Sequence, residues 1–195
     1  MTTAIRSNRL DLIPMTPAFM RASLGGDLIE AERHVGLTLP RTWPDVRDVL
    51  ALRLGQLESE PTLQPWLLRA IGLRSSREMV GHIGFHTAPG ADYLEPWSPG
   101  GAEFGFTIFP PHRRRGYARE ASLALMQWAR DVHDVTSFVV TISPSNGPSL
   151  ALAAGLGFVR VGAHVDEVDG PEDVLVRNVP NGRLTRVTPD GRGVL

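Results

Sequence analysis

The stretch FPPHRRRGYAREA, residues 109–121, places three consecutive arginines between a proline-rich turn and the start of an amphipathic run. The strand-like EFGFTIF leads into it, and helix-forming residues follow from Gly116. The first turn of a helix presents unpaired backbone N–H groups and the positive end of the helix dipole, which together attract anions. Gly116 lets the chain bend without a side chain in the way, and Ala118 leaves room near the helix start. This strand, turn and helix can therefore cradle a diphosphate.

Two other interpretations of this arginine turn (residues 110–116) need no phosphate cradle. Short basic runs are often solvated surface features, so the turn could bind nothing. It could instead contact nucleic acid, but one arginine cluster lacks the extended basic face that tracks a phosphate backbone. The turn also matches neither the Walker loop nor the GxGxxG dinucleotide fingerprint. We therefore expect no nucleic-acid partner.

The composition of the chain narrows the choice of function further. With 195 residues and 42% hydrophobic content, it is typical of one globular domain. Its formal net charge of −1 gives it no net positive charge that would attract an anionic membrane. It contains no cysteine, which excludes disulfides, zinc–thiolate sites and cysteine nucleophiles, and we expect no metal. All 20 basic residues are arginine, a bias typical of GC-rich bacterial genomes. The sequence shows no signal peptide or membrane-spanning run, so a cytoplasmic protein is expected.

The order of strand-like and helix-like segments predicts one mixed α/β domain over residues 1–178, with a tail over 179–195. Strands are predicted at 9–15, 66–74, 79–87, 103–109, 137–142, 158–162 and 172–179. Helices are predicted as a short pair within 16–36, then over 42–61, 116–132 and 147–155. In the second of these regions Pro44 suits the first helical turn. The apolar face of the 116–132 helix is predicted to hold Ala118, Ala121, Leu125, Trp128, Ala129 and Val132.

Two motifs at their spacing resemble the GNAT superfamily of acyl-CoA-dependent N-acyltransferases. RRRGYA matches the family pattern Arg/Gln-x-x-Gly-x-Gly/Ala through Arg113, Gly116 and Ala118. Downstream, SPSNGPSLALAAGLGF is similar to the second segment of the ribosomal-protein N-terminal acetyltransferase branch. The resemblance implies a twisted, mostly antiparallel sheet of six to seven strands with helices on both faces. Its two central parallel strands, EFGFTIF and SFVVTI, would splay apart to open a slot.

The same resemblance implies an acetyl-CoA site around the arginine turn. Backbone groups of Phe106 and Ile108 would pair with the amide-rich pantetheine arm as an added strand would. Asn146 would contact the cofactor or shape the neighbouring strand end. The pyrophosphate would be held by the turn and the helix start, at Arg113, Arg114, Arg115, Gly116, Tyr117, Ala118 and Arg119.

Acetyl transfer from a thioester to an amine needs a base for the amine, and often an acid for the departing thiolate. Glu103, at the start of the central strand, is our candidate base, although it could simply pair with an arginine. His82 and His86, four apart on one strand and so on one face, are alternatives. Many family members carry a tyrosine acid where this sequence has Ala153. Ser149 is therefore our candidate acid, although it could equally cap the short helix.

The acceptor is expected to be a primary amine on a small molecule or a peptide. The acidic segment HVDEVDGPED, residues 164–173, could attract a cationic amine or could be a solvated hairpin tip. Trp43 and Trp97 could line the acceptor groove or pack beneath it. Alternatives to a general N-acetyltransferase are an aminoglycoside or polyamine acetyltransferase and a catalytically weak acyl-CoA-binding module. A homodimer is common in the resembling branch and is possible here.

Overall fold

A computed structural model of the chain describes residues 3–44, 46–166 and 170–180. Its strands are β1 (Ile5–Arg6), β2 (Leu10–Pro14), β3 (Arg69–Leu73), β4 (Met79–Phe85), β5 (Ala102–Ile108), β6 (Ser137–Ile142), β7 (Val159–Asp166) and β8 (Gly170–Asn178). Its α-helices are α1 (Pro17–Gly25), α2 (Leu28–Val35), α3 (Arg47–Ser59), α4 (Tyr117–His133) and α5 (Gly147–Gly155). Among these described residues no helix has the length and apolar character that a membrane crossing needs.

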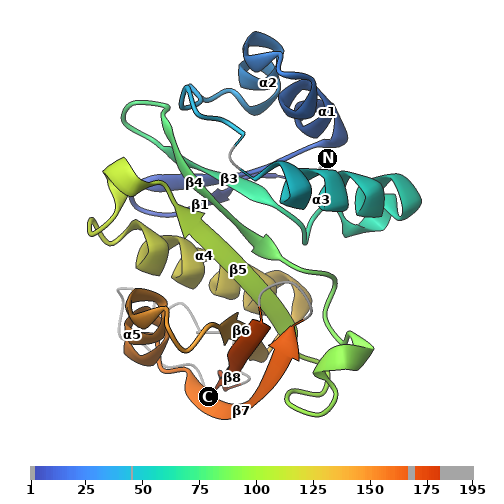
Figure 1. The fold of residues 1–195 in the computed structure, drawn as a ribbon, viewed down its shortest axis with the longest axis vertical. Helices are drawn as coiled ribbons and strands as arrows, with labels where there is room; N and C mark the ends of the chain where they lie inside the picture. The colour runs from blue at the N-terminus through green and yellow to red at the C-terminus, as the bar shows by residue number, and fades with distance from the viewer. Residues whose placement is uncertain (1–2, 45, 167–169, 181–195) are drawn as a thin grey trace, which may run out of the picture.

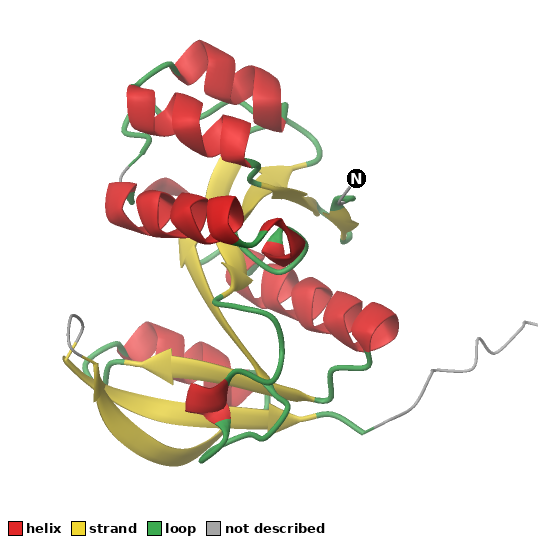
Figure 2. Ribbon diagram, turned by 90° about the vertical axis from the view of Figure 1, so that its right-hand side faces the viewer, coloured by secondary structure: helices red, strands yellow, loops and turns green. Residues whose placement is uncertain are grey.

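The strands form one open sheet in the order β1-β2-β3-β4-β5-β6-β8-β7 (Figure 1). All described neighbours are antiparallel except β5 and β6, which run parallel and pair at only two positions, Ala102 with Phe138 and Glu103 with Val139. Beyond Glu103 the two strands separate, and the two halves of the sheet diverge from there (Figure 2). The predicted sheet with splayed parallel central strands is confirmed, and the two-residue β1 makes the described strands eight rather than six or seven.

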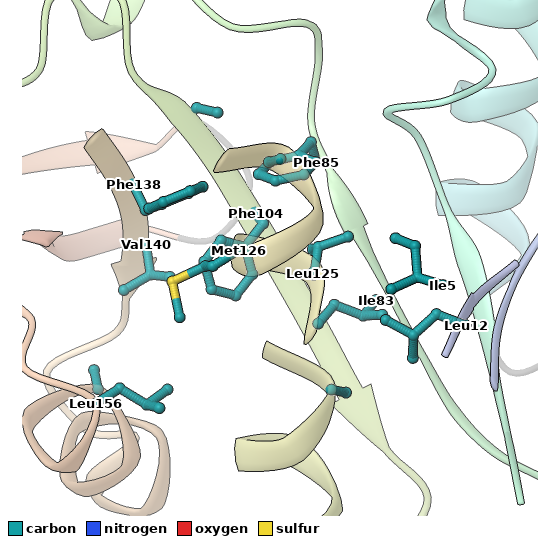
Figure 3. Packing of buried hydrophobic residues seen from close by; sticks show 14 of the residues in the cluster. Ile5, Leu12, Ile83, Phe85, Phe104, Leu125, Met126, Phe138, Val140 and Leu156 are labelled. Carbon is teal, nitrogen blue, oxygen red and sulfur yellow. The ribbon is translucent and has the colours of Figure 1, made fainter. Parts of the chain in front are cut away.

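Helices cover both faces of the sheet, because side chains alternate between its two sides. On β3, Ile71 joins the cluster packed under α4, whereas its neighbour Ala70 joins the cluster under α1 to α3. Figure 3 shows the first cluster, in which Leu125 and Met126 of α4 lie near Phe104 of the central strand. This packing holds α4 against β5. The arginine turn connects the end of β5 at Ile108 to the start of α4 at Tyr117.

Two details of the predicted helices are wrong. α3 begins at Arg47, not in the turn that contains Pro44, because Trp43 is buried against Phe19 and Phe109 and holds that segment in the loop before the helix. Val132 does not face the core: it is 61% exposed. The buried face of α4 is instead rotated toward Ala121, Ser122, Leu125, Met126 and Ala129.

Candidate functional site

A cavity of about 270 Å³ lies where β5 and β6 separate. The sheet forms one side, and α4 and α5 supply the rest of its wall. The cavity brings together predicted site residues from two distant segments, Phe106 on β5 and the pair Asn146 and Ser149 at the start of α5. Its remaining lining is Phe104, Gly105, Ser122, Val140, Thr141, Ile142, Ser143, Leu152, Ala153, Leu156, Phe158 and Glu172.

The edge of β5 that faces the cavity carries backbone groups without a strand partner. On the other edge, the N–H of His86 donates to the carbonyl of Glu103, and the N–H of Phe109 donates to Val80. Backbone groups of successive strand residues point to alternate sides. Phe106 and Ile108 therefore turn their N–H and C=O groups toward the gap, where no described strand pairs with β5 beyond Glu103.

Two residues of the arginine turn, on either side of Arg115, have a left-handed backbone conformation. Arg114 has φ 62° and Gly116, the N-cap of α4, has φ 80°. Turns of this kind gather successive N–H groups into a concave anion site, and the unpaired first turn of α4 adds its own N–H groups and dipole. Arg113 holds the turn to the strand, because its Nε donates to the carbonyl of Ile108 at 2.9 Å. The side chains of Arg113, Arg114, Arg115 and Arg119 are exposed around it.

Arg9, which lies just before β2, clamps this turn from the side. Its Nε and backbone N–H both donate to the carboxylate of Glu120 at 2.7 Å, and its Nη1 donates to the carbonyl of Arg115 at 3.1 Å. The guanidinium also lies 4.8 Å above the ring of Tyr117. Burial alone would raise the pKa of Glu120, but the bonds from Arg9 and Ser7 lower it. Glu120 thus stabilises the start of α4 and holds Arg9 in place.

On the face of β5 that is turned away from α4, Glu103 lies at the centre of a buried hydrogen-bond network. It is 5% exposed and accepts a 2.7 Å bond from the hydroxyl of Thr141. Its other oxygen is 3.4 Å from Nδ1 of His86, and the hydroxyl of Tyr93 also donates to it. Burial alone would raise the pKa of Glu103, but these partners outweigh it and lower the pKa, so the carboxylate is ionised at neutral pH.

Two groups beside Glu103 respond to its charge. Partial burial, followed by the charge of Glu103, raises the pKa of Tyr93, which keeps that phenol protonated as a donor. Burial lowers the pKa of Arg53 on α3, while Tyr93 and Glu103 oppose that shift. Arg53 Nη1 donates to the carbonyl of His86 at 2.9 Å and so anchors the segment that carries the imidazole. The described residues contain no group of three His, Cys, Asp or Glu side chains suited to a metal ion.

The two candidate histidines share the face opposite α4, as predicted, but they differ in surroundings. His82 is 6% exposed, with the rings of Trp43 and Phe109 at centroid distances of 6.4 and 6.3 Å. His86 keeps a 37% exposed side chain next to Glu103. A Cβ added at Gly105 would lie 3.0 Å from Nε2 of His86, so this edge of the imidazole lies beside Gly105, which lines the cavity although His86 itself does not.

The start of α5 separates two roles that the sequence left open. Asn146 is the N-cap, because its side chain accepts the backbone N–H of Ser149 at 3.2 Å. Ser149 therefore does not cap the helix, and its hydroxyl is available at the cavity that it lines. Ala153 stands one turn later on the same wall and is buried.

Of the features proposed for the acceptor groove, some line the cavity and others do not. Trp43 packs in the core under α1 to α3, and Trp97 packs against Gly162 of β7, so neither lines the cavity. Of the acidic segment 164–173, Glu172 lines the cavity and lies 3.7 Å from His164, whereas residues 167–169 lie outside the described residues. The predicted tail lies almost wholly outside them too, since the description ends at residue 180.

Sequence reasoning missed four residues of this region: Arg9, Tyr93, Ser122 and Thr141. Each is a common polar type in an unremarkable local pattern, and each gains its place only through a contact with another element of the fold or at the cavity wall. The alternation of β6 does put Thr141 on the face opposite the buried Val140, which is the single local signal we find.

Comparison with known proteins agrees with this architecture. The family model for the acetyltransferase (GNAT) domain matches residues 9–159, well over half of the chain. No curated protein sequence matches this chain. An acetyltransferase from Agrobacterium tumefaciens superposes with TM-score 0.60 at 24% identity, covering 92% of this chain and 96% of its own.

Two further solved structures have the same fold at lower identity. The ribosomal-protein-S5-alanine acetyltransferase from Vibrio fischeri superposes with TM-score 0.59 at 12% identity, over 90% of this chain and 96% of its own. The microcin C7 self-immunity acetyltransferase MccE, in complex with acetyl-CoA and AMP, does so with TM-score 0.58 at 15% identity, over 89% and 94%. At such identities the likeness shows the fold alone, whereas the family match over residues 9–159 shows descent. The chain belongs to the GNAT acetyltransferase family.

Proposed function

We propose that this chain transfers an acetyl group from acetyl-CoA to a primary amine by direct attack. The observation that carries the proposal is the junction of an anion cradle at residues 114–116 with the unpaired edge of β5 and the cavity beyond it. When bound, acetyl-CoA supplies an activated thioester. A diphosphate fits the converging N–H groups of the cradle, and an amide-rich arm fits a strand edge that lacks a partner. The MccE complex supports this choice of donor.

The cradle and its neighbours, residues Arg113 to Arg119, would hold the pyrophosphate, mainly through backbone N–H groups and the dipole of α4. Phe106 and Ile108 would pair with the pantetheine arm through their backbone groups. The carbonyl of Ile108 already accepts Arg113, so its N–H is the group left to polarise the thioester carbonyl. Asn146 would act by fixing the start of α5 beside the arm.

For proton removal from the amine, we propose that His86 and Glu103 act as a pair. Glu103 already accepts bonds from Thr141, Tyr93 and His86 and is buried, so it is poorly placed to take a proton itself. His86 holds Nδ1 3.4 Å from that carboxylate, and its Nε2 lies beside Gly105, a residue that lines the cavity. Nε2 would take a proton from the bound ammonium and leave a neutral amine to attack the thioester, and Glu103 would stabilise the resulting imidazolium and orient the ring.

Ser149 is the proposed acid for the departing thiolate, because its hydroxyl lines the cavity and Ala153 cannot donate a proton. It would give its proton to the sulfur as the carbon–sulfur bond breaks and regain one from solvent. The alternative, a catalytically weak acyl-CoA-binding module, keeps the same cradle and cavity but needs no proton donor.

A CoA-release assay over N-terminal peptides, polyamines and aminoglycosides tests the proposal and selects the acceptor class. Turnover with peptides would favour a protein acceptor, and turnover with polyamines or aminoglycosides would favour a small-molecule acceptor. Tight CoA binding without turnover over the panel would favour the binding module. If acetyl-CoA neither binds nor raises the melting temperature of the protein, the proposal fails. A bacterial source, a cytoplasmic location and a homodimer stay predictions of the sequence and its resemblance.

Arg9→Ala is expected to weaken CoA binding about tenfold, because it removes the bonds that hold the carbonyl of Arg115 and the carboxylate of Glu120 in place. Isothermal titration with CoA measures the loss. Pantetheine, which lacks the diphosphate, should bind Arg9→Ala and the unmodified protein equally. Arg33→Ala is a matched control, since Arg33 also pairs with a helical glutamate, Glu30, but on α2. An equal loss for pantetheine would mean that Arg9 supports the fold and not the cradle.

A further inference from the structure

Ser122, in the second turn of α4, is a buried polar side chain without a partner in the described structure. The residue is 0% exposed, and its Oγ makes no hydrogen bond to any described group. It is also one of the residues that line the cavity between the splayed strands. Because the backbone of a helix interior is already paired, the hydroxyl is the group of Ser122 that still needs a hydrogen-bond partner.

A buried hydroxyl without a hydrogen bond is unfavourable, because folding removes it from water and returns nothing. A helical serine usually relieves this by donating to the carbonyl four residues earlier, here that of Ala118. That bond is not formed in the structure. The cavity is lined by apolar residues such as Phe104, Val140 and Phe158 and also by polar ones, but no described group hydrogen-bonds to Ser122 Oγ.

We propose that Ser122 Oγ donates a hydrogen bond to an amide carbonyl oxygen of the bound acyl-CoA arm. The inference rests on the proposed function, since it names a further binding residue for the same ligand. A neutral carbonyl fits the position, because Ser122 is fully buried and burial of a charged group costs far more free energy than burial of a neutral one. The adenine and diphosphate end would lie at the cradle formed by residues 114–116 and would not touch Ser122.

The proposal predicts effects of opposite sign for Ser122→Ala. Without ligand, the variant should melt a few degrees higher, because it loses an unsatisfied buried hydroxyl. Its affinity for CoA should fall about five- to tenfold, because the ligand carbonyl loses its donor. Differential scanning calorimetry measures the first effect and isothermal titration measures the second. Adenosine 3′,5′-bisphosphate, which lacks the arm, should bind the variant and the unmodified protein equally.

Ser23→Ala is the matched control. Ser23 on α1 is also 0% exposed, but its Oγ accepts the indole N–H of Trp43 at 3.0 Å, outside the cavity. This variant should melt lower and bind CoA unchanged. A lower melting temperature for Ser122→Ala with unchanged CoA affinity would show an internal bond, such as one to Ala118, and would overturn the inference. Failure of the unmodified protein to bind CoA would instead overturn the proposed function and the inference with it.

Discussion

Gly116→Glu is expected to weaken CoA binding at least about 100-fold, the loss of two charge-assisted hydrogen bonds. Gly116 has φ 80°, a conformation that residues with a Cβ adopt at a cost, and a Cβ there would lie 3.4 Å from Nη2 of Arg9. The glutamate side chain would put a negative charge at the unpaired N–H groups of α4. It would compete with a diphosphate for those donors and repel it.

Arg114→Ala is the comparison that separates backbone from charge. Arg114 also has a left-handed φ of 62°, but its side chain is exposed and its backbone contribution survives the change to alanine. We expect a loss of only a few-fold in CoA affinity, as is usual for one exposed charge. Isothermal titration ranks the two variants, and circular dichroism checks that each is folded. The reverse ranking would mean that the turn acts as a basic patch.

The parts of the fold predicted from sequence are those with strong local signals. The run SFVVTI predicts β6 with its observed bounds, Ser137–Ile142, because a continuous β-branched run suits a strand covered on both sides. The arginine turn was predicted because strand, turn and helix follow one another within the stretch 103–133. Gly116 has a left-handed backbone conformation, which glycine adopts more easily than residues that carry a Cβ.

The parts that escaped prediction depend on pairing between distant segments. Nothing in the neighbourhood of Glu103 indicates that Thr141 and Tyr93 both donate to it, because each comes from another element. Arg9 reaches Glu120 across 111 residues of sequence. The phase of α4 was misjudged for the same reason: whether Val132 or Met126 is buried depends on how far the sheet extends beneath the helix, which no single window of sequence contains.

His86→Gln is expected to lower kcat/KM about 100-fold for a basic amine acceptor, since this is the low end of what a positioned base contributes. Glu103→Gln should cause a loss of similar size, and the double variant should be little worse than either, because the two side chains act as one unit. For a weakly basic amine that is already neutral at the assay pH, the losses should be much smaller. Steady-state kinetics with both kinds of amine measure the difference.

The pH dependence follows from the lowered pKa of Glu103. Its carboxylate is ionised throughout the neutral range, so the protonation of Glu103 should not change the activity there. The contribution of Glu103 to stability is present above the ordinary glutamate pKa of 4.5 and is lost as the pH falls through the lowered value.

The control is His34→Gln, because His34 also lies near a glutamate, 3.2 Å from Glu30, but on α2 and away from the cavity. It should leave kcat/KM and its pH profile unchanged. Gly105→Ala adds a geometric check: its Cβ would lie 3.0 Å from Nε2 of His86, so it should push the imidazole aside while the bond from Thr141 to Glu103 is kept. If Gly105→Ala and His86→Gln retain full activity with basic amines while Glu103→Gln does not, the carboxylate is the base itself and the histidine is a bystander.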